Sequence, residues 1–220
     1  MIGTIIVFWG CITFEHKQFT MGISIHPEAK ALIFDLDGTL SNSLPVHVET
    51  WKMIGEKYGF DFDPQIIHDM TGRPTLEFAL RIVDQYKVEE KPEVLVRLKQ
   101  QSFWDMAHLL EPVAEVISIV KECYGKLPMA VGTGASGKSA EVQLKALGLT
   151  DYFDFVVSAD DVTKHKPHPE TFLKCAELMK TAPEFCQVFE DGDLGISAAR
   201  EAGMFITDVR EYISYGEWAK

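Results

Sequence analysis

Two pairs of acidic residues in this 220-residue sequence follow short apolar runs. The first pair, Asp35 and Asp37, lies in Asp-Leu-Asp-Gly-Thr, directly after the run that starts at Ala31. Open parallel sheets bind ligands at the carboxyl ends of their strands, where one carboxylate can attack as a nucleophile while its neighbour transfers protons. An Asp-Gly turn that caps the next element is the structural alternative, but the full pattern of four fixed residues is rare by chance. The pair therefore predicts a catalytic site.

The second acidic pair, Glu190 and Asp191, ends another apolar run and would reach the same edge of the sheet. Oxygen ligands from two strand ends suit a hard cation that keeps several waters, and Mg²⁺ is the natural candidate. The alternative is a pair of carboxylates stabilised by the N-terminus of the following helix. Taken together with Asp35 and Asp37, the pair favours a metal site.

Candidate phosphate-binding groups follow two other segments. Thr133 closes the run Met129–Gly132 in a glycine-rich turn, and Lys166 lies in His-Lys-Pro-His-Pro. A hydroxyl group, exposed backbone amides around Gly134 and one ammonium group would supply the donors that a phosphoryl group needs. Lys164 competes with Lys166 for this role, and a lysine before proline is often only a solvated loop residue.

The glycine-rich turn also matches a nucleotide-binding pattern. Residues 132–139, Gly-Thr-Gly-Ala-Ser-Gly-Lys-Ser, fit G-x-x-x-x-G-K-[ST] between a predicted strand and a predicted helix, which is the context of a P-loop. Against this, the loop comes late in the chain, behind a strand that already carries acidic residues, and only the region of Asp160 offers a partner aspartate. A P-loop protein is therefore the less favoured interpretation, although Lys138 could bind phosphate in either fold.

Short apolar runs alternate with amphipathic stretches from Ala31 onward. The runs predict buried strands over residues 31–35, 127–132, 153–158, 187–191 and 204–209, with helices over about 138–147, 169–180 and 195–202. This alternation predicts an α/β fold with a doubly wound parallel sheet. Residues 44–111 show helical periodicity without a buried strand, so we expect a small helical insertion after the first strand.

Composition excludes several classes of protein. Hydrophobic residues make up 46% and charged residues 25% of the chain, as in a compact globular protein. With 21 Lys and Arg against 33 Asp and Glu, the net charge of −12 opposes binding to nucleic acid or to an acidic membrane surface. The 4 cysteines include no C-x-x-C pair and fit buried thiols in a reduced compartment, so we expect a cytoplasmic protein.

The N-terminal residues stand apart from the rest of the chain. The run Ile2–Phe14 is almost wholly apolar, but it is too short to cross a bilayer and lacks the basic flank and cleavage site of a signal peptide. A chain that began at Met21 would retain every motif described above. We therefore expect residues 1–24 to be an N-terminal extension or an extra strand that takes no part in the chemistry.

In this combination and order, the motifs resemble the haloacid dehalogenase superfamily. The likeness is greatest to its β-phosphoglucomutase-like branch, and within it to the sugar phosphatases that act on fructose 1-phosphate or 6-phosphogluconate. It extends over about residues 31–210 and rests on Phe-Asp-Leu-Asp-Gly-Thr-Leu (34–40), Pro-Met-Ala-Val-Gly-Thr-Gly (128–134), His-Lys-Pro-His-Pro (165–169) and Val-Phe-Glu-Asp (188–191). The resemblance implies a Rossmann-like core of residues 25–43 and 112–220, with a helical cap of residues 44–111 that closes over the site.

The resemblance also implies roles for the acidic residues. Asp35 would attack phosphorus to form an aspartyl-phosphate, while Asp37 would protonate the leaving oxygen and then activate water. Mg²⁺ would be held by Asp35, the Asp37 carbonyl and Asp191, with Glu190 beside it. Charge alone supports this dependence on a cation, because four carboxylates facing a phosphate would repel it.

The resemblance assigns the binding groups as well. Thr133 and Lys166 would hold the transferring phosphoryl group. In the cap, His47 matches the family histidine just beyond the first hinge, Arg73 falls in the substrate-specificity loop, and Lys99 matches a cap lysine. A cap arginine or lysine is more often a solvated helix charge than a ligand contact.

Three positions depart from the family pattern. Asn42 stands where relatives usually carry Asp, Leu44 where sugar-phosphate members often carry Glu, and His165 where Gly commonly precedes the lysine. Leu44 matters most, because a missing polar contact at the hinge would alter which sugar phosphate is preferred.

We expect a Mg²⁺-dependent phosphatase of a small phosphorylated sugar. The nearest alternative is a β-phosphoglucomutase, which returns the phosphoryl group from the same aspartate to the sugar.

Overall fold

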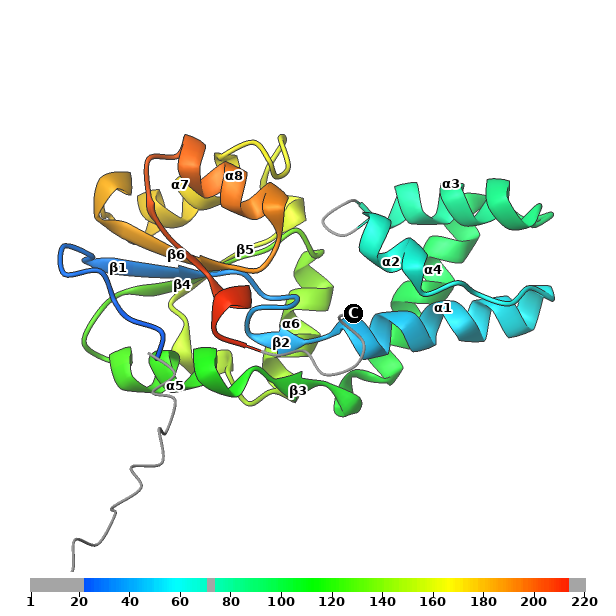
Figure 1. Cartoon of the computed structure of the whole chain (residues 1–220), viewed down its shortest axis with the longest axis horizontal. Helices are drawn as coiled ribbons and strands as arrows, with labels where there is room; N and C mark the ends of the chain where they lie inside the picture. The colour runs from blue at the N-terminus through cyan, green and yellow to red at the C-terminus, as the bar shows by residue number, and fades with distance from the viewer. Residues whose placement is uncertain (1–21, 71–73, 214–220) are drawn as a thin grey trace, which may run out of the picture.

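The computed structural model describes residues 22–70 and 74–213 of the chain. It shows a sheet with helices on both faces and a separate group of helices beside it (Figure 1). Within the described residues, no helix is long and apolar enough to cross a bilayer. The expected N-terminal extension lies outside the described residues except for its last three positions, 22–24.

The central sheet of the described part of the chain has five parallel strands in the order β5-β4-β1-β6-β7. Their bounds are β1 Ala31–Phe34, β4 Met129–Gly132, β5 Phe155–Val157, β6 Cys186–Glu190 and β7 Phe205–Asp208. β1 lies in the middle, where Ile33 pairs with Ala130 on one side and Val188 on the other. The five predicted strands are confirmed, with ends that differ from the prediction by one or two residues.

Helices cover both faces of the sheet (Figure 1). One layer contains α5 (Ala114–Cys123) and α6 (Gly137–Ala146), and the other contains α7 (Glu170–Leu178) and α8 (Asp193–Glu201). Side chains of β1 alternate between the layers, because Leu32 and Phe34 pack with the first and Ala31 and Ile33 with the second. The doubly wound α/β fold is therefore confirmed, with α5 as an additional helix.

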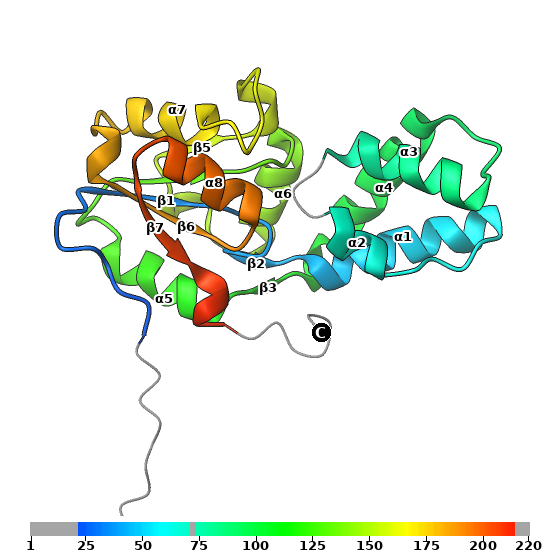
Figure 2. The same cartoon turned by 45° about the horizontal axis from the view of Figure 1, so that its top comes forward.

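The helical insertion stands to one side of the sheet and has its own core (Figures 1 and 2). It contains α1 (Leu44–Tyr58), α2 (Gln65–Met70), α3 (Thr75–Tyr86) and α4 (Pro92–Asp105). Its core centres on Trp51, Ile82 and Leu95. An antiparallel ribbon of β2 (Ser41–Asn42) and β3 (Glu111–Pro112) connects both ends of the insertion to the sheet. The chain therefore enters and leaves the insertion at one place.

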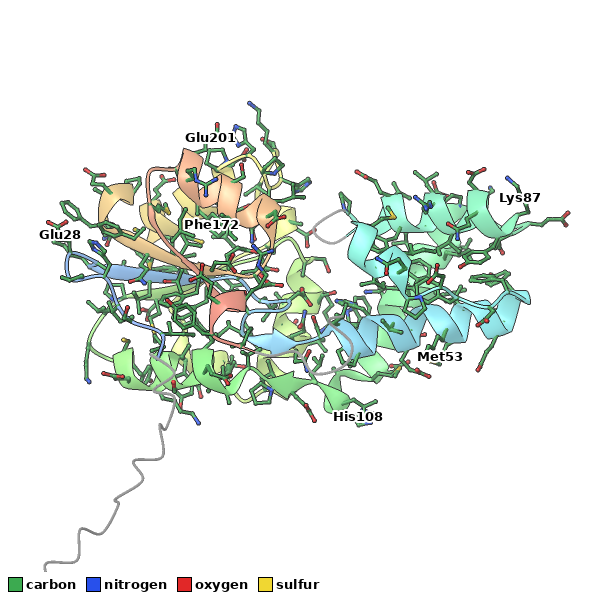
Figure 3. All side chains as sticks on the ribbon, viewed as in Figure 1. Glu28, Met53, Lys87, His108, Phe172 and Glu201 are labelled. Carbon is green, nitrogen blue, oxygen red and sulfur yellow. The ribbon has the colours of Figure 1, made fainter. Side chains whose placement is uncertain are left out.

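Short 3-10 helices complete the described chain, over Ala107–Leu109, Thr150–Tyr152, Ala159–Asp161, Pro183–Phe185 and Val209–Glu211. In the side-chain view, Phe172 points into the interior, whereas Glu28, Lys87 and Glu201 lie at the periphery (Figure 3). The three cysteines in the described residues are free and buried, as expected, and Cys11 lies outside those residues.

Candidate active site

Three carboxylates meet at the carboxyl ends of the neighbouring strands β1 and β6. Asp35 follows β1, Glu190 ends β6 and Asp191 follows it, and one carboxylate oxygen from each lies within 4.8 Å of the others. Asp35 is 6% exposed and Glu190 4% exposed. Parallel pairing of Phe34 with Phe189 fixes the register that brings these ends together. The structure thus places the two predicted acidic pairs at one edge of the sheet.

Lys166 supplies the positive charge at this carboxylate cluster. Its Nζ lies 2.6 Å from Oδ1 of Asp35 and 2.8 Å from Oε2 of Glu190, and its side chain is 10% exposed. Burial lowers the pKa of Lys166, but the charges of the two carboxylates outweigh burial and raise that pKa above its ordinary value. Of the two candidate lysines, Lys166 reaches the site, whereas Lys164 is exposed and its backbone N–H donates to Glu170.

The carboxylate cluster fits a divalent cation. Burial and the charge of Glu190 raise the pKa of Asp35 well above its ordinary value and the pKa of Asp191 to about 7, and Lys166 offsets only part of this effect. Excess negative charge on closely spaced oxygen donors is the environment that Mg²⁺ prefers. Thr39 adds a hydrogen bond from Oγ1 to Oδ1 of Asp191, 3.1 Å long, which orients that carboxylate.

Two glycines make room for the same carboxylates. A Cβ atom at Gly38 would overlap the carboxylate of Asp191, and one at Gly195 would overlap the carboxyl group of Glu190. Gly38 also has a φ of +87°, a backbone conformation that other residues rarely adopt. The Asp-Gly turn of the first motif is therefore part of the acidic site. The turn and the catalytic site, which the sequence offered as alternatives, occur together.

Asp37 faces the helical insertion rather than the carboxylate cluster. Its Oδ1 lies 3.2 Å from Nε2 of His47 on α1 and 3.0 Å from Nε2 of Gln143 on α6. Burial raises the pKa of Asp37, but hydrogen bonds from His47 and Ser43 and the nearby positive charge of Lys99 outweigh burial and lower that pKa to about 2. Asp37 is thus an ionised carboxylate held from two directions.

Lys99 joins this group from α4. Its Nζ lies 2.8 Å from Nδ1 of His47, and both side chains approach the ring of Phe103, at centroid distances of 4.7 Å for the ammonium group and 4.5 Å for the imidazole. Burial lowers the pKa of Lys99 to about 8, and burial and the charge of Lys99 lower the pKa of His47. The structure thus brings two of the three predicted cap residues to Asp37, while Arg73 lies outside the described residues.

The glycine-rich turn lies at the same edge of the sheet, after β4. The Oγ1 of Thr133 accepts a hydrogen bond from the backbone N–H of Ala135, 3.0 Å long, and the space next to Gly134 is open. Since β4 is the immediate neighbour of β1, these two residues follow a strand end adjacent to Asp35. The turn therefore offers a hydroxyl group and accessible backbone beside the acidic residues.

The P-loop pattern has a different use in this fold. The ammonium group of Lys138 is exposed and pairs with Glu141 at 3.1 Å. The hydroxyl of Ser139 accepts a hydrogen bond from Nε1 of Trp104, and the backbone N–H of Gly137 donates to Asp160. The lysine that would bind a nucleotide thus forms an ion pair within α6, and the hydroxyl group contacts the end of the insertion.

Sequence reasoning gave no site role to Thr39, Ser43 or Gln143, and Gln143 is the most distant of them in the chain. Its signal was present in the helical pattern, because Gln143 occupies a buried position between Ala140 and Leu144 on α6. A polar residue on an otherwise apolar helix face marks a position where packing is not the only requirement. The sequence cannot show that this position faces Asp37, which lies 106 residues earlier in the chain.

Comparison with known proteins supports the interpretation of these motifs. Residues 32–209 match the sequence profile described as haloacid dehalogenase-like hydrolase. The chain is 44% identical over 181 residues to the fructose-1-phosphate phosphatase YqaB of Escherichia coli, covering 81% of this chain and 95% of that protein. It is 30% identical over 181 residues to the phosphorylated carbohydrates phosphatase of Thermotoga maritima, covering 80% and 82% respectively.

Solved structures agree with the sequence matches. The β-phosphoglucomutase of Clostridium difficile is 26% identical and superposes with a TM-score of 0.68, covering 81% of this chain and 83% of that one. The expected resemblance to the β-phosphoglucomutase-like branch and its sugar phosphatases is thereby confirmed. The chain therefore belongs to the haloacid dehalogenase-like hydrolase family and is a phosphoric monoester hydrolase.

Proposed function

We propose that this hydrolase removes the phosphoryl group from a small phosphorylated sugar, with Asp35 as the nucleophile and Mg²⁺ as the cofactor. The observation that carries the proposal is the placement of the buried Asp35 carboxylate, 2.6 Å from Lys166 and beside Glu190 and Asp191. A nucleophilic carboxylate needs a fixed position and nearby positive charge to meet an anionic phosphoryl group. The similarity to phosphatases of phosphorylated carbohydrates supports the substrate class.

The first chemical step joins an oxygen of Asp35 to phosphorus while the bond from phosphorus to the sugar oxygen breaks. Asp37 is ionised in the free enzyme and takes up a proton when the anionic phosphate binds beside it, because a nearby negative charge raises the pKa of a carboxyl group. It then acts as general acid and gives this proton to the leaving oxygen, so the sugar departs as an alcohol. In the second step Asp37 takes a proton from water, which attacks phosphorus and releases inorganic phosphate, and the bond from phosphorus to Asp35 breaks. Asp37 regains a proton in this step and loses it when inorganic phosphate leaves, so the enzyme returns to its starting state.

Charge stabilisation comes from the groups around Asp35. Lys166 and the hydroxyl group of Thr133 hold the phosphoryl oxygens, and the backbone around Gly134 adds donors. Asp35, the Asp37 carbonyl and Asp191, with Glu190 beside them, would hold Mg²⁺, which would supply the charge that offsets repulsion between the carboxylates and the phosphate.

Residues 44–111 act as the cap of this core, formed by residues 25–43 and 112–220. The β2–β3 ribbon is the place where such a cap pivots. From the cap, His47 brings a hydrogen-bond donor to Asp37 and Lys99 brings positive charge beside His47, and we assign Arg73 to the substrate as well. A closed cap excludes water from the first step, when only the sugar oxygen is to receive the proton.

Substitution of the nucleophile tests the mechanism. Asp35→Asn keeps the shape of the side chain and removes its nucleophilic charge, so phosphate release should fall to background while the far-UV circular dichroism spectrum stays unchanged. Asp151→Asn, at an exposed carboxylate outside the site, is the control and should retain activity. A fully active Asp35→Asn variant would exclude Asp35 as the nucleophile.

The substrate class needs a separate experiment. Phosphate release should be measured with a panel of fructose 1-phosphate, glucose 6-phosphate, 6-phosphogluconate and pyrophosphate. A clear preference for one or more sugar phosphates supports the proposal, and a preference for pyrophosphate contradicts it.

The alternative function is that of a β-phosphoglucomutase, which the structural likeness to such an enzyme favours. The two activities share the aspartyl-phosphate and differ in what receives the phosphoryl group. Incubation of the wild-type protein with β-glucose 1-phosphate separates them. Free phosphate indicates the phosphatase, whereas glucose 6-phosphate without free phosphate indicates the mutase.

A further inference from the structure

Gln143 is a buried polar side chain in the interior of the core. It lies on α6 with 1% of its surface exposed, on the helix face that also buries Ala140 and Leu144. Ala140 and Leu144 are apolar and pack against the sheet. Packing alone would be served equally well by an apolar residue of similar length at position 143.

The Gln143 amide group is directed at the carboxylate that exchanges protons. Its Nε2 donates to Oδ1 of Asp37 over 3.0 Å, and Nε2 of His47 lies 3.2 Å from the same oxygen. One of these partners belongs to the core and the other to the helical insertion. The contact of Gln143 with Asp37 lies within the core, because α6 and the strand before Asp37 pack in the same hydrophobic cluster.

The other end of the Gln143 amide group has no partner. Its Oε1 is buried and accepts no hydrogen bond from the described residues. An unsatisfied buried carbonyl group destabilises a fold, whereas an apolar side chain would avoid the cost. A residue that lowers stability in this way and also contacts a reacting group is expected to have a functional role.

We infer that Gln143 is a positioning residue for proton transfer, an inference that rests on the proposed function. With Oδ1 of Asp37 held by Nε2 of Gln143, the carboxyl group cannot rotate freely, and Oδ2 is left to take up a proton and pass it on. As the bond from phosphorus to the sugar oxygen breaks, the proton passes from Oδ2 to that oxygen. Gln143 therefore acts through Asp37.

The test compares two substrates that differ in their need for the proton. A sugar leaves as a basic alkoxide unless it is protonated, whereas nitrophenolate leaves readily without a proton. The comparison uses kcat/KM, which reports the steps up to departure of the leaving group. The substrates are p-nitrophenyl phosphate and the fastest sugar phosphate of the panel.

Gln143→Met removes the hydrogen-bond donor and keeps the length of the side chain. A hydrogen bond to a charged group corresponds to about ten- to a hundredfold in rate, so kcat/KM for the sugar phosphate should fall by that factor. The value for p-nitrophenyl phosphate should change less than threefold, and Tm should stay the same or rise. Leu144→Met, at the neighbouring buried position, is the matched control and should leave both values unchanged.

Each outcome decides the matter. An equal fall for both substrates, or no fall for either, overturns the role of Gln143 while the proposed phosphatase stands. A wild-type protein that hydrolyses neither substrate overturns the phosphatase, and with it any proton transfer for Gln143 to assist. Loss of activity in Gln143→Met with a lowered Tm and the same loss in Leu144→Met would show a structural role for this part of α6.

Discussion

Lys99 is a buried ammonium group, and its burial predicts an unusual pH dependence of stability. The side chain is 8% exposed, with Nζ 2.8 Å from Nδ1 of His47 and 4.7 Å from the centre of the Phe103 ring. Burial lowers the pKa of Lys99 from 10.5 to about 8, and the charge of Asp37 offsets only part of this change. The folded protein therefore holds the Lys99 proton less tightly than the unfolded chain does.

The size and sign of the effect follow from this pKa. A change from 10.5 to about 8 corresponds to about 3 kcal/mol of folding free energy. Between these two pH values the unfolded chain binds more protons, so the Lys99 contribution to the free energy of unfolding rises with pH. Below pH 8 both states are charged and the full cost is present, and above pH 10.5 both are neutral and the cost is absent.

Lys99→Met removes this contribution and keeps the length of the side chain. The free energy of unfolding of the variant minus that of the wild type should fall by about 3 kcal/mol between pH 7 and pH 10.5. Urea unfolding at a series of pH values measures this difference directly. Lys145→Met, at an exposed position, is the control and should run parallel to the wild type. A difference between Lys99→Met and wild type that stays constant across this range would refute the argument.

Three further predictions concern the carboxylate cluster and the phosphate-binding turn. Gly195→Ala places a methyl group against the Glu190 carboxyl group, so Mg²⁺ activation of phosphate release should need at least about tenfold more metal. Gly22→Ala, in open space, is the control and should leave the metal requirement unchanged. Thr133→Val removes one donor to the phosphoryl group and should lower kcat/KM about tenfold or more. The free energy of unfolding, measured in urea, should also fall by about 1 kcal/mol, because the Ala135 N–H loses its acceptor. Removal of divalent metal by a chelator should abolish phosphate release and lower Tm, and Mg²⁺, added in excess of the chelator, should restore both.

The sheet and the acidic site could be predicted from the sequence because their signals are local. A strand buried on both faces is a continuous apolar run, and the residue that follows it lies at the carboxyl end of the sheet. Asp35 and Glu190 could therefore be placed at one edge without knowledge of the register. Spacing alone could not separate Lys166 from Lys164, because the loop between β5 and α7 has no periodic pattern that indicates which lysine turns inward. The family resemblance selected Lys166.

The arrangement around Asp37 could not be predicted, because it depends on contacts between distant elements. His47, Lys99 and Gln143 come from three helices and reach one carboxylate only through the relative position of the insertion and the core. The ribbon of β2 and β3 has two residues in each strand, too few for any alternation pattern to appear. Positions of this kind follow from tertiary packing rather than from local sequence.

The central claim is that a phosphoryl group passes through Asp35. The most direct measurement is to mix the wild-type protein with its best sugar phosphate, quench within the first turnover, reduce any acyl phosphate with borohydride and map the protein by peptide mass spectrometry. Borohydride converts a phosphorylated aspartate into homoserine. We predict homoserine at position 35 and at no other aspartate, and none in the Asp35→Asn variant. Homoserine at position 37 or 191, or turnover without any modified residue, would contradict the account.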